Sequence, residues 1–375
     1  MKISRIRIYQ PKKSNPHFNQ SDWVVTVETD AGLIGIGEGG THDTLAQCAA
    51  ALIGEDADRV QHLWQLMYRG WFYPAGREKL HALGAIDMAL WDLKGKQLNA
   101  PVYELLGGLT RNYIECYSTG FPWQGSLAET AQACVQAGFR AYRTAVADPG
   151  DGVFDARRMV EQTAANCREI AEAVDGRGDW AIDFHTRLDL ADAVRLCGLI
   201  EPLNPLFVED PLRSENPGVL STLRTQVKVP IAVGEQFGDR WDINELIERH
   251  LIDYTRVTLP NVGGITEWIK IAAICETHYV GMVPHFTGPI SLAALVHVLC
   301  ALPVPAIVEI GGAIPRLPSH LTLGCTFRDG KLWPEPHAGL GVEFDPEGAQ
   351  LIAEITEHDE PIPTYRRPDG SFTNW

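Results

Sequence analysis

Two hydrophobic patterns divide the chain. The first is an alternation of apolar and polar residues, typical of half-buried strands, and it occupies residues 2–9, 23–29 and 33–38. From Thr44 to about Lys96 the period becomes helical. Because Asp30-Ala-Gly32 turns the chain between the last two runs, we expect an antiparallel meander followed by helices. These elements predict a small α+β domain over residues 1–112.

After residue 112 the two patterns take turns along the chain. Strand-like runs occur near residues 113–118, 139–145, 180–183, 206–209, 230–234, 254–258, 280–284 and 306–309. Helical stretches separate them at residues 127–137, 155–174, 189–199, 218–225, 243–250, 265–278 and 291–302. This alternation predicts an α/β fold, a (β/α)7β-type TIM barrel over residues 113–338. The tail, residues 339–375, is predicted to return to the first domain, which would cap the barrel.

Composition and charge limit the classes of partner. The 375 residues are 45% apolar and 21% charged, as in ordinary globular proteins. No apolar run approaches the roughly 18–20 residues of a membrane span, and the N-terminus lacks a signal-peptide core, so we expect a cytoplasmic protein. Eight scattered cysteines without a Cys-x-x-Cys pair predict free thiols. The net charge of −16 argues against nucleic acid and anionic membranes as partners, but a negatively charged small-molecule substrate stays possible because a bound metal can reverse the local field.

Three carboxylates follow apolar runs at a constant spacing. Asp183, Glu209 and Glu235 are each 26 residues apart, about the length of one strand and one crossover helix. The spacing places them at equivalent ends of successive parallel strands, at the mouth where barrel enzymes carry their chemistry. Each acid alone could equally be the N-cap of the next helix. Together, three oxygen ligands favour a hard divalent cation, Mg²⁺ before Zn²⁺.

Other polar residues stand at the ends of the predicted strands. His185 lies two residues after Asp183, on the same side of the strand, and His285 ends the run Met-Val-Pro-His. Arg143 is the only charged residue of its run, and Glu309 ends the eighth strand. A single histidine is more often structural than catalytic, and an arginine or glutamate can belong to a surface ion pair. Their shared position at strand ends makes all four candidates for the site.

A glycine motif near the N-terminus has a different explanation. Gly35-x-Gly37-x-x-Gly40 matches the dinucleotide-binding fingerprint in spacing. It follows a strand of the meander, however, and no βαβ unit surrounds it. We therefore do not interpret it as a nucleotide site.

Further motifs connect these candidates to a known family. They are Asp183-Phe-His185, Val208-Glu-Asp-Pro211, Gly234-Glu235, Val262-Gly-Gly-Ile-Thr-Glu267, Pro284-His285, Gly339-Leu-Gly-Val342, Gly35-x-Gly37-Glu38 and Ala85-Ile-Asp-x-Ala-Leu-Trp-Asp-x-Lys-Gly95. With these motifs the chain resembles the mandelate racemase subgroup of the enolase superfamily over nearly its whole length. Asp-x-His at this strand end is typical of the sugar-acid dehydratases of the galactonate and mannonate type.

The resemblance implies roles for the candidate residues. Asp183, Glu209 and Glu235 would hold Mg²⁺, which chelates the substrate carboxylate and stabilises the enediolate formed when the α-proton is removed. His285 would be the base, and His185 would protonate the departing 3-hydroxyl. Glu309 would bind a carboxylate oxygen of the substrate. The expected product is a 2-keto-3-deoxy acid.

Two departures from the family pattern concern the bases. Galactonate-type relatives have an aspartate where this chain has Thr258, and that aspartate orients the strand-seven histidine and raises its basicity. Mannonate-type relatives pair the strand-two arginine with a tyrosine on the next loop, but residues 146–155 contain no Tyr. The Lys-x-Lys of the racemases is replaced by Arg143 and Ala145. Because arginine rarely gives up a proton, racemisation is disfavoured.

Two other functions therefore stay open beside dehydration. One is another enolate reaction on the same metal, such as cycloisomerisation or epimerisation. The other is a protein that binds a sugar acid with little turnover. The identity of the sugar acid, aldonate or aldarate, depends in this family on loops of the capping domain, where His17 and Trp71 are the candidates. The resemblance also implies a homo-oligomer, an octamer in many members.

Overall fold

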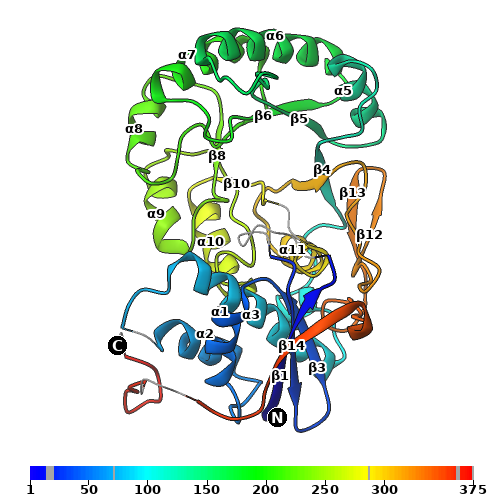
Figure 1. The fold of residues 1–375 in the computed structure, drawn as a ribbon, viewed down its shortest axis with the longest axis vertical. Helices are drawn as coiled ribbons and strands as arrows, with labels where there is room; N and C mark the ends of the chain where they lie inside the picture. Colours follow the sequence, from blue (N-terminus) through cyan, green and yellow to red (C-terminus); the bar gives the residue numbers. More distant parts are fainter. Residues whose placement is uncertain (14–20, 71, 286–287, 360–363, 374–375) are drawn as a thin grey trace.

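The computed structural model of the chain has two parts, stacked along its long axis (Figure 1). It describes residues 1–13, 21–70, 72–285, 288–359 and 364–373. In Figure 1 an antiparallel sheet with its helices forms the lower part, and a ring of strands covered by helices forms the upper part. The first part is called the capping domain below, and the second the barrel.

The capping domain is built on the predicted meander. Its strands lie in the order β14-β1-β2-β3, and every pair is antiparallel. Their bounds are β1 Ile3–Pro11, β2 Val24–Thr29, β3 Ile34–Glu38 and β14 Ala349–Ile355. The C-terminal β14 pairs with β1, which confirms that the tail returns to this domain. The helices of this part are α1 His42–Ala50, α2 Val60–Arg69, α3 Gly76–Leu98 and α4 Val102–Leu105.

Helix α3 joins the two parts. Most of its residues are buried, because one side packs on the capping sheet and the other approaches the barrel. A Cβ on Gly35 or Gly37 of β3 would lie about 2 Å from the carbonyl oxygens of Ala89 and Ala85 of α3. The glycine motif therefore allows close packing of a strand on a helix, in agreement with its rejection as a nucleotide site.

The barrel has the predicted alternation of strands and helices. Its strands are β4 Ile114–Thr119, β5 Ala141–Ala145, β6 Asp179–Asp183, β7 Val208–Glu209, β8 Ile231–Val233, β9 Tyr254–Thr255, β10 Gly281–Met282 and β11 Val308–Gly311. The helices between them are α5 Leu127–Gln136, α6 Ala156–Val174, α7 Leu190–Ile200, α8 Val219–Arg224, α9 Arg240–Glu248, α10 Ile265–Thr277 and α11 Pro289–Ala301. Neighbouring strands are parallel, and β11 pairs with β4. The bridge Met282–Ala306 joins the ends of this sheet, which confirms the (β/α)7β-type barrel.

A hairpin at the barrel edge was not predicted. Strands β12 Cys325–Arg328 and β13 Lys331–Pro334 pair antiparallel, and β13 also pairs with β4. No strand was expected after Glu309, where the chain is rich in Pro and Gly. These four-residue strands depend on pairing with β4, and such long-range pairing leaves little local signal.

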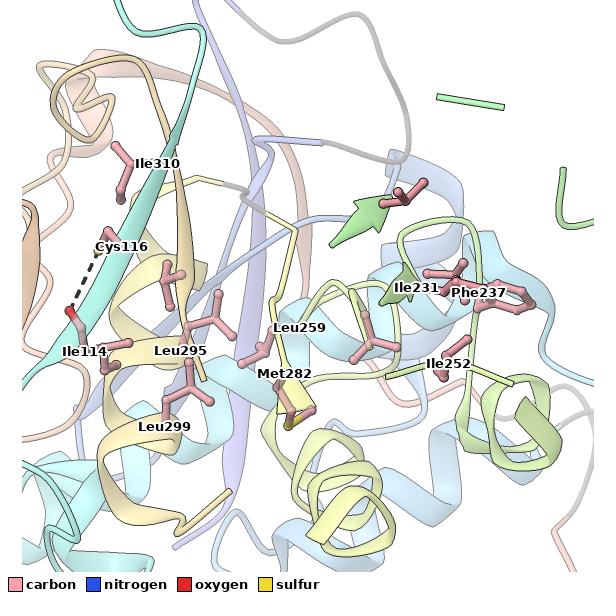
Figure 2. Close-up of a cluster of buried hydrophobic side chains, with 14 of the residues drawn as sticks. Ile114, Cys116, Ile231, Phe237, Ile252, Leu259, Met282, Leu295, Leu299 and Ile310 are labelled. Atoms are coloured by element: carbon pink, nitrogen blue, oxygen red, sulfur yellow. Dashed lines mark hydrogen bonds between the residues drawn. The ribbon is translucent and has the colours of Figure 1, made fainter. Parts of the chain in front are cut away.

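Helix α11 lies in the core that the barrel and the hairpin share. All its residues are buried, as expected for a helix that is apolar on every side. In Figure 2, Leu295 and Leu299 of α11 face Ile114 and Cys116 of β4, and Met282 of β10 belongs to the same cluster. The strand ends on this side are therefore held by continuous apolar packing.

Two expectations from composition can be compared with the fold. Within the described ranges, none of the helices is both long and apolar enough to cross a membrane. All eight cysteines are free and buried, as the scattered spacing predicted.

Candidate active site

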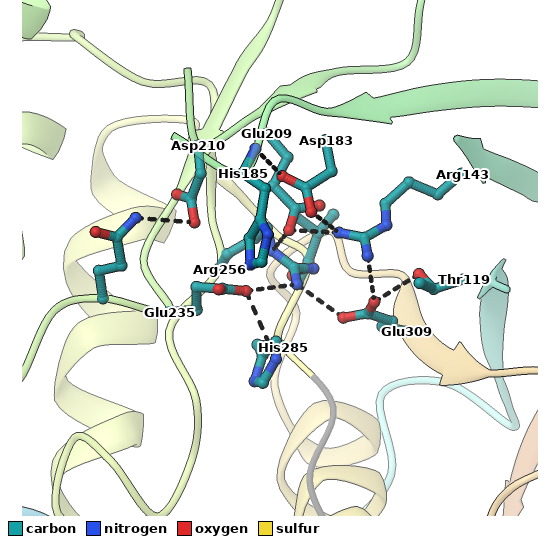
Figure 3. Close-up of polar contacts among 12 residues, drawn as sticks. Thr119, Arg143, Asp183, His185, Glu209, Asp210, Glu235, Arg256, His285 and Glu309 are labelled. Carbon is teal, nitrogen blue, oxygen red and sulfur yellow. Dashed lines mark hydrogen bonds and ion pairs between the residues drawn. The ribbon is translucent and has the colours of Figure 1, made fainter. Parts of the chain in front are cut away.

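The predicted acids converge at the carboxyl ends of the barrel strands (Figure 3). Asp183 ends β6 and is in register with Glu209, which ends β7. Glu235 follows β8 by two residues, and Glu309 lies in β11. All four are buried or nearly buried. The barrel therefore concentrates negative charge where water is scarce, and such charges need partners.

Arg143 of β5 is one partner. Its Nη1 lies 3.0 Å from Oδ2 of Asp183 and 2.5 Å from Oε1 of Glu209, and its Nη2 lies 3.3 Å from Oε1 of Glu309. Burial alone would lower the pKa of Arg143, but Glu209 and Glu309 outweigh it and raise this pKa above its ordinary value. Arg143 thus points into the site and stays charged.

Arg256 is the second partner, and the sequence did not single it out. Its side chain is fully buried; Nε lies 2.8 Å from Glu209, and Nη2 lies 2.7 Å from Glu309 and 3.3 Å from Glu235. Nη1 also donates to the Tyr117 hydroxyl. A signal was present, because Arg256 is the only charge in its predicted strand, as Arg143 is in its own.

The two guanidinium groups control the ionisation of Glu309. Burial would raise its pKa, but Arg256 and Arg143 outweigh burial, so the pKa of Glu309 lies below its ordinary value. Thr119 also donates a hydrogen bond of 2.5 Å to its Oε1. Glu309 is therefore an ionised acceptor at the inner end of the site.

Asp210 has the opposite environment. It has no ion pair among the described residues, and burial together with Glu235 and Asp183 raises its pKa well above the ordinary value. Gln236 donates to its Oδ2 at 3.3 Å. A cation bound close to Asp210 would offset the repulsion between its carboxylate and those of Glu235 and Asp183.

The described residues contain one cluster suited to a metal ion. Glu209, Asp210 and Glu235 each place one carboxylate oxygen within 4.8 Å of the others. Both oxygens of Glu209 are buried and make no hydrogen bond, although Oε1 contacts the two arginines. An all-oxygen, buried and incompletely satisfied set fits a hard divalent cation. Two of the three predicted ligands belong to this set, while Asp183 lies beside it, next to Arg143.

The two histidines occupy different positions. His185 is exposed, and its backbone N–H donates to Oδ1 of Asp183 at 2.6 Å. Its φ of 47° is unusual for a residue with a Cβ and is of the kind found at functional sites. His285 is buried; its Nδ1 lies 3.2 Å from Oγ1 of Thr258, and its Nε2 lies 3.5 Å from Oε2 of Glu235.

The environment of His285 keeps it neutral. Burial lowers its pKa, and this effect exceeds the attraction of Glu235 and Glu309, which would raise it. A neutral imidazole has the free electron pair that a general base requires. In Figure 3, His185 is drawn above the Glu235 carboxylate and His285 below it.

Two cavities adjoin this centre. One, of about 320 Å³, adjoins Glu309, and the other, of about 540 Å³, adjoins Glu235 and the N-terminal part of α3. His17 and Trp71, the predicted substrate-binding residues, lie outside the described residues. Their roles stay predictions.

Comparison with known proteins agrees with this architecture. Residues 126–348 match the family model "Enolase C-terminal domain-like", and residues 13–107 match "Mandelate racemase / muconate lactonizing enzyme, N-terminal domain". A barrel with a carboxylate-rich mouth under an α+β cap is thus the class defined by the fold and the site. The chain belongs to the enolase superfamily, in the mandelate racemase/muconate lactonizing enzyme family.

Relatives match over the whole chain. D-galactonate dehydratase of Pectobacterium atrosepticum is 32% identical and that of Ralstonia pickettii 34% identical, each over 100% of both chains. The crystal structure of an enolase from Agrobacterium radiobacter, with Na and L-malate bound, has a TM-score of 0.83 and 27% identity. It covers 99% of each chain.

Proposed function

We propose that this protein dehydrates a sugar acid, an aldonate or an aldarate, to a 2-keto-3-deoxy acid in a Mg²⁺-dependent reaction. The observation that carries the proposal is the pairing of a buried carboxylate cluster with two histidines at the same barrel mouth. The full-length relatives named D-galactonate dehydratase support the reaction class.

Asp183, Glu209 and Glu235 are the proposed metal ligands. Arg143 contacts both Asp183 and Glu209, and Arg256 contacts both Glu209 and Glu235, so cationic groups already bridge neighbouring members of this set. Asp210 would be an additional oxygen near the ion. When bound, Mg²⁺ supplies positive charge beside the substrate carboxylate and makes the adjacent C–H bond more acidic.

The histidines perform the two proton transfers of the proposal. His285 takes the proton from C2, since it is neutral and buried beside Glu235. As the C3–O bond breaks, His185 donates a proton to the leaving hydroxyl, which departs as water. The resulting enol takes up a proton at C3 and releases the proton of its C2 hydroxyl, which gives the 2-keto-3-deoxy acid. Arg143 stays charged and, in this proposal, holds the carboxylates in place.

Glu309 positions the substrate in this scheme, and the two arginines hold Glu309 in place. Glu309 is fixed by Arg143, Arg256 and Thr119, so it can accept a hydrogen bond without moving. Because Glu309 is ionised, the substrate group that it binds must carry a hydrogen to donate, as a hydroxyl or a protonated carboxyl oxygen does.

A second candidate function rests on Thr258. The hydroxyl of Thr258 contacts His285 but brings no negative charge to raise its basicity. Binding of a sugar acid with little turnover needs no base, whereas another enolate reaction would still need one to remove the α-proton. Both alternatives use the same carboxylate cluster.

The test is a screen of the purified protein with Mg²⁺ against a library of aldonic and aldaric acids, with detection of 2-keto-3-deoxy products. The same reactions with EDTA are the control. We expect product from at least one acid, lost in EDTA. No product from any acid, with Mg²⁺ binding shown by calorimetry, would contradict dehydration and favour the second candidate.

The proposal also includes a cytoplasmic homo-oligomer. The support is the family resemblance, in which octamers are common. Light scattering of the purified chain would give its mass in solution, and a monomer of 41.4 kDa would contradict it.

A further inference from the structure

The cavity beside Glu309 is built by both parts of the molecule. It measures about 320 Å³, and Glu309, which lines it, also belongs to the site described above. Its polar wall comes from the capping domain, from Glu309 and from the segment that follows β11. The titratable residues of this wall are Lys13, Asp22, Glu38, Glu309, Arg316 and His320.

Two cations of this wall are not neutralised by the protein. Lys13 follows β1 of the capping domain, and Arg316 follows β11 of the barrel. Both are exposed, and neither makes an ion pair or a hydrogen bond with any residue that the structure describes. Lys13 and Arg316 therefore bring two positive charges to the lining of this cavity, one from the capping domain and one from the barrel.

The acids of the cavity compensate these charges only in part. Glu309 already faces Arg143 and Arg256. Glu38 is buried, and its Oε1 accepts the backbone N–H of Ser291 at 2.8 Å at the start of α11.

Burial of Glu38 raises its pKa to about 7, so this carboxyl carries only part of a negative charge at neutral pH. Asp22 is the remaining carboxylate of the wall. His320 is buried, and burial lowers its pKa, so it adds no positive charge at neutral pH. The outer wall therefore carries two cations, Lys13 and Arg316, and one carboxylate that lies outside the barrel mouth and the core, Asp22.

We propose that this cavity binds the second carboxylate of a sugar diacid, so that the substrate class is aldarate and not aldonate. The inference rests on the proposed function, since it assigns the far end of the same substrate. The first carboxylate lies at the metal cluster, the hydroxylated chain passes Glu309, and the second carboxylate reaches Arg316 and Lys13. Arginine suits this role because its planar guanidinium binds a carboxylate through two hydrogen bonds.

The test compares hexarates with the hexonates of the same configuration. The two members of a pair differ only at C6, a carboxylate in one and a CH₂OH group in the other. Turnover with Mg²⁺ is measured for the wild type, Arg316→Met and Lys13→Met. Lys228→Met is the control, because Lys228 is 87% exposed and precedes β8 on the opposite face of the barrel.

We expect the wild type to have the higher kcat/KM for the hexarate. Arg316→Met is expected to raise the KM of the hexarate by about tenfold to a hundredfold, because a charge-assisted hydrogen bond is lost. Lys13→Met is expected to raise this KM by a smaller factor. The KM of the hexonate should not change in Arg316→Met or Lys13→Met. In Lys228→Met the KM of neither acid should change. Preference for the hexonate, or an equal effect of Arg316→Met on both acids, would overturn the proposal.

Calorimetry separates this inference from the proposed function. The dissociation constants of the same hexarates and hexonates are measured with Mg²⁺ present. If neither acid is dehydrated but hexarates bind more tightly and lose this advantage in Arg316→Met, the dehydratase proposal fails and the diacid site stands. If hexarates and hexonates bind equally, or neither binds, the diacid site is excluded.

Discussion

Thr258 Oγ1 lies 3.2 Å from Nδ1 of His285, and both side chains are buried. On the opposite side of the ring, Nε2 faces Glu235 at 3.5 Å. The imidazole is therefore held from two sides, by a neutral hydroxyl and by a carboxylate of the proposed metal set. The galactonate-type pattern has an aspartate in place of the hydroxyl. Thr258 can fix the orientation of the ring but cannot supply the charge.

The hydroxyl contact leads to a prediction about turnover. Thr258→Val keeps the shape of the side chain and removes the partner of Nδ1. We expect kcat to fall by about tenfold to a hundredfold, as when the partner of a functional histidine is removed, while KM and Tm stay close to the wild type. Initial rates over a range of substrate concentrations measure this. Unchanged kcat would show that Thr258 does not orient the base.

Arg256 is predicted to oppose metal binding while it stabilises the metal-free fold. Arg256→Met leaves Glu209, Glu235 and Glu309 with one cation fewer, and breaking such a buried pair costs about 3–5 kcal/mol. We expect a lower Tm in EDTA and a larger rise in Tm on adding Mg²⁺ than in the wild type.

Thermal denaturation during a Mg²⁺ titration measures both effects of Arg256→Met. Arg140→Met is the matched control, because Arg140 pairs with Asp179 at the other end of the barrel strands and is 50% exposed. An equal Mg²⁺-induced shift in Arg256→Met and the wild type would contradict the proposed competition.

The contact between α3 and the barrel gives a test of the domain packing. A Cβ on Gly84 of α3 would lie 2.1 Å from the carbonyl oxygen of Pro260, whereas one on Gly198 of α7 would meet nothing within 4 Å. Both substitutions by Ala improve helix propensity by about 1 kcal/mol. We expect Gly198→Ala to raise the Tm and Gly84→Ala to lower it, since overpacking costs about 1–3 kcal/mol. Thermal denaturation of both variants measures this, and a higher Tm in Gly84→Ala would contradict the close contact.

Asp87 makes stability depend on pH. It lies on α3, and its Oδ2 accepts the backbone N–H of Thr266 at 3.0 Å. Burial raises its pKa from 3.8 to about 7. Between these values the folded state binds more protons than the unfolded state, so the free energy of unfolding falls as pH rises.

Asp87→Asn removes this titration, and the slope should become shallower by up to about 1.4 kcal/mol per pH unit between pH 4 and 7. The Tm measured at several pH values for both proteins gives the two slopes. Parallel curves would show that Asp87 titrates as it does in water.

The fold could be predicted because its signals are local. The helix expected at 265–278 is α10, Ile265–Thr277, since a continuous apolar stripe fixes its length. The strands expected at 254–258 and 280–284 keep only two paired residues each, β9 and β10. After those residues the chain no longer pairs with the neighbouring strands and enters the site. The pattern of apolar and polar residues does not reveal where this pairing ends.

The candidate site could be predicted where one acid follows one strand. Asp210 was missed because strand alternation sends it away from Glu209. Its φ of 38° departs from strand geometry, and in the fold both carboxylates reach the same cluster. Arg256 was missed although, like Arg143, it is the only charge in its predicted strand, and its partners are carboxylates that other strands bring to it.

The most direct test of the central claim is exchange of the C2 hydrogen in heavy water. The acid found in the screen is incubated with Mg²⁺ and the wild type, His285→Asn or His185→Asn, and NMR follows both exchange and product. We predict product with the wild type, neither exchange nor product with His285→Asn, and exchange without product with His185→Asn. Exchange in His285→Asn as fast as in the wild type would contradict the assignment of His285 as the base and, with it, the proposed mechanism.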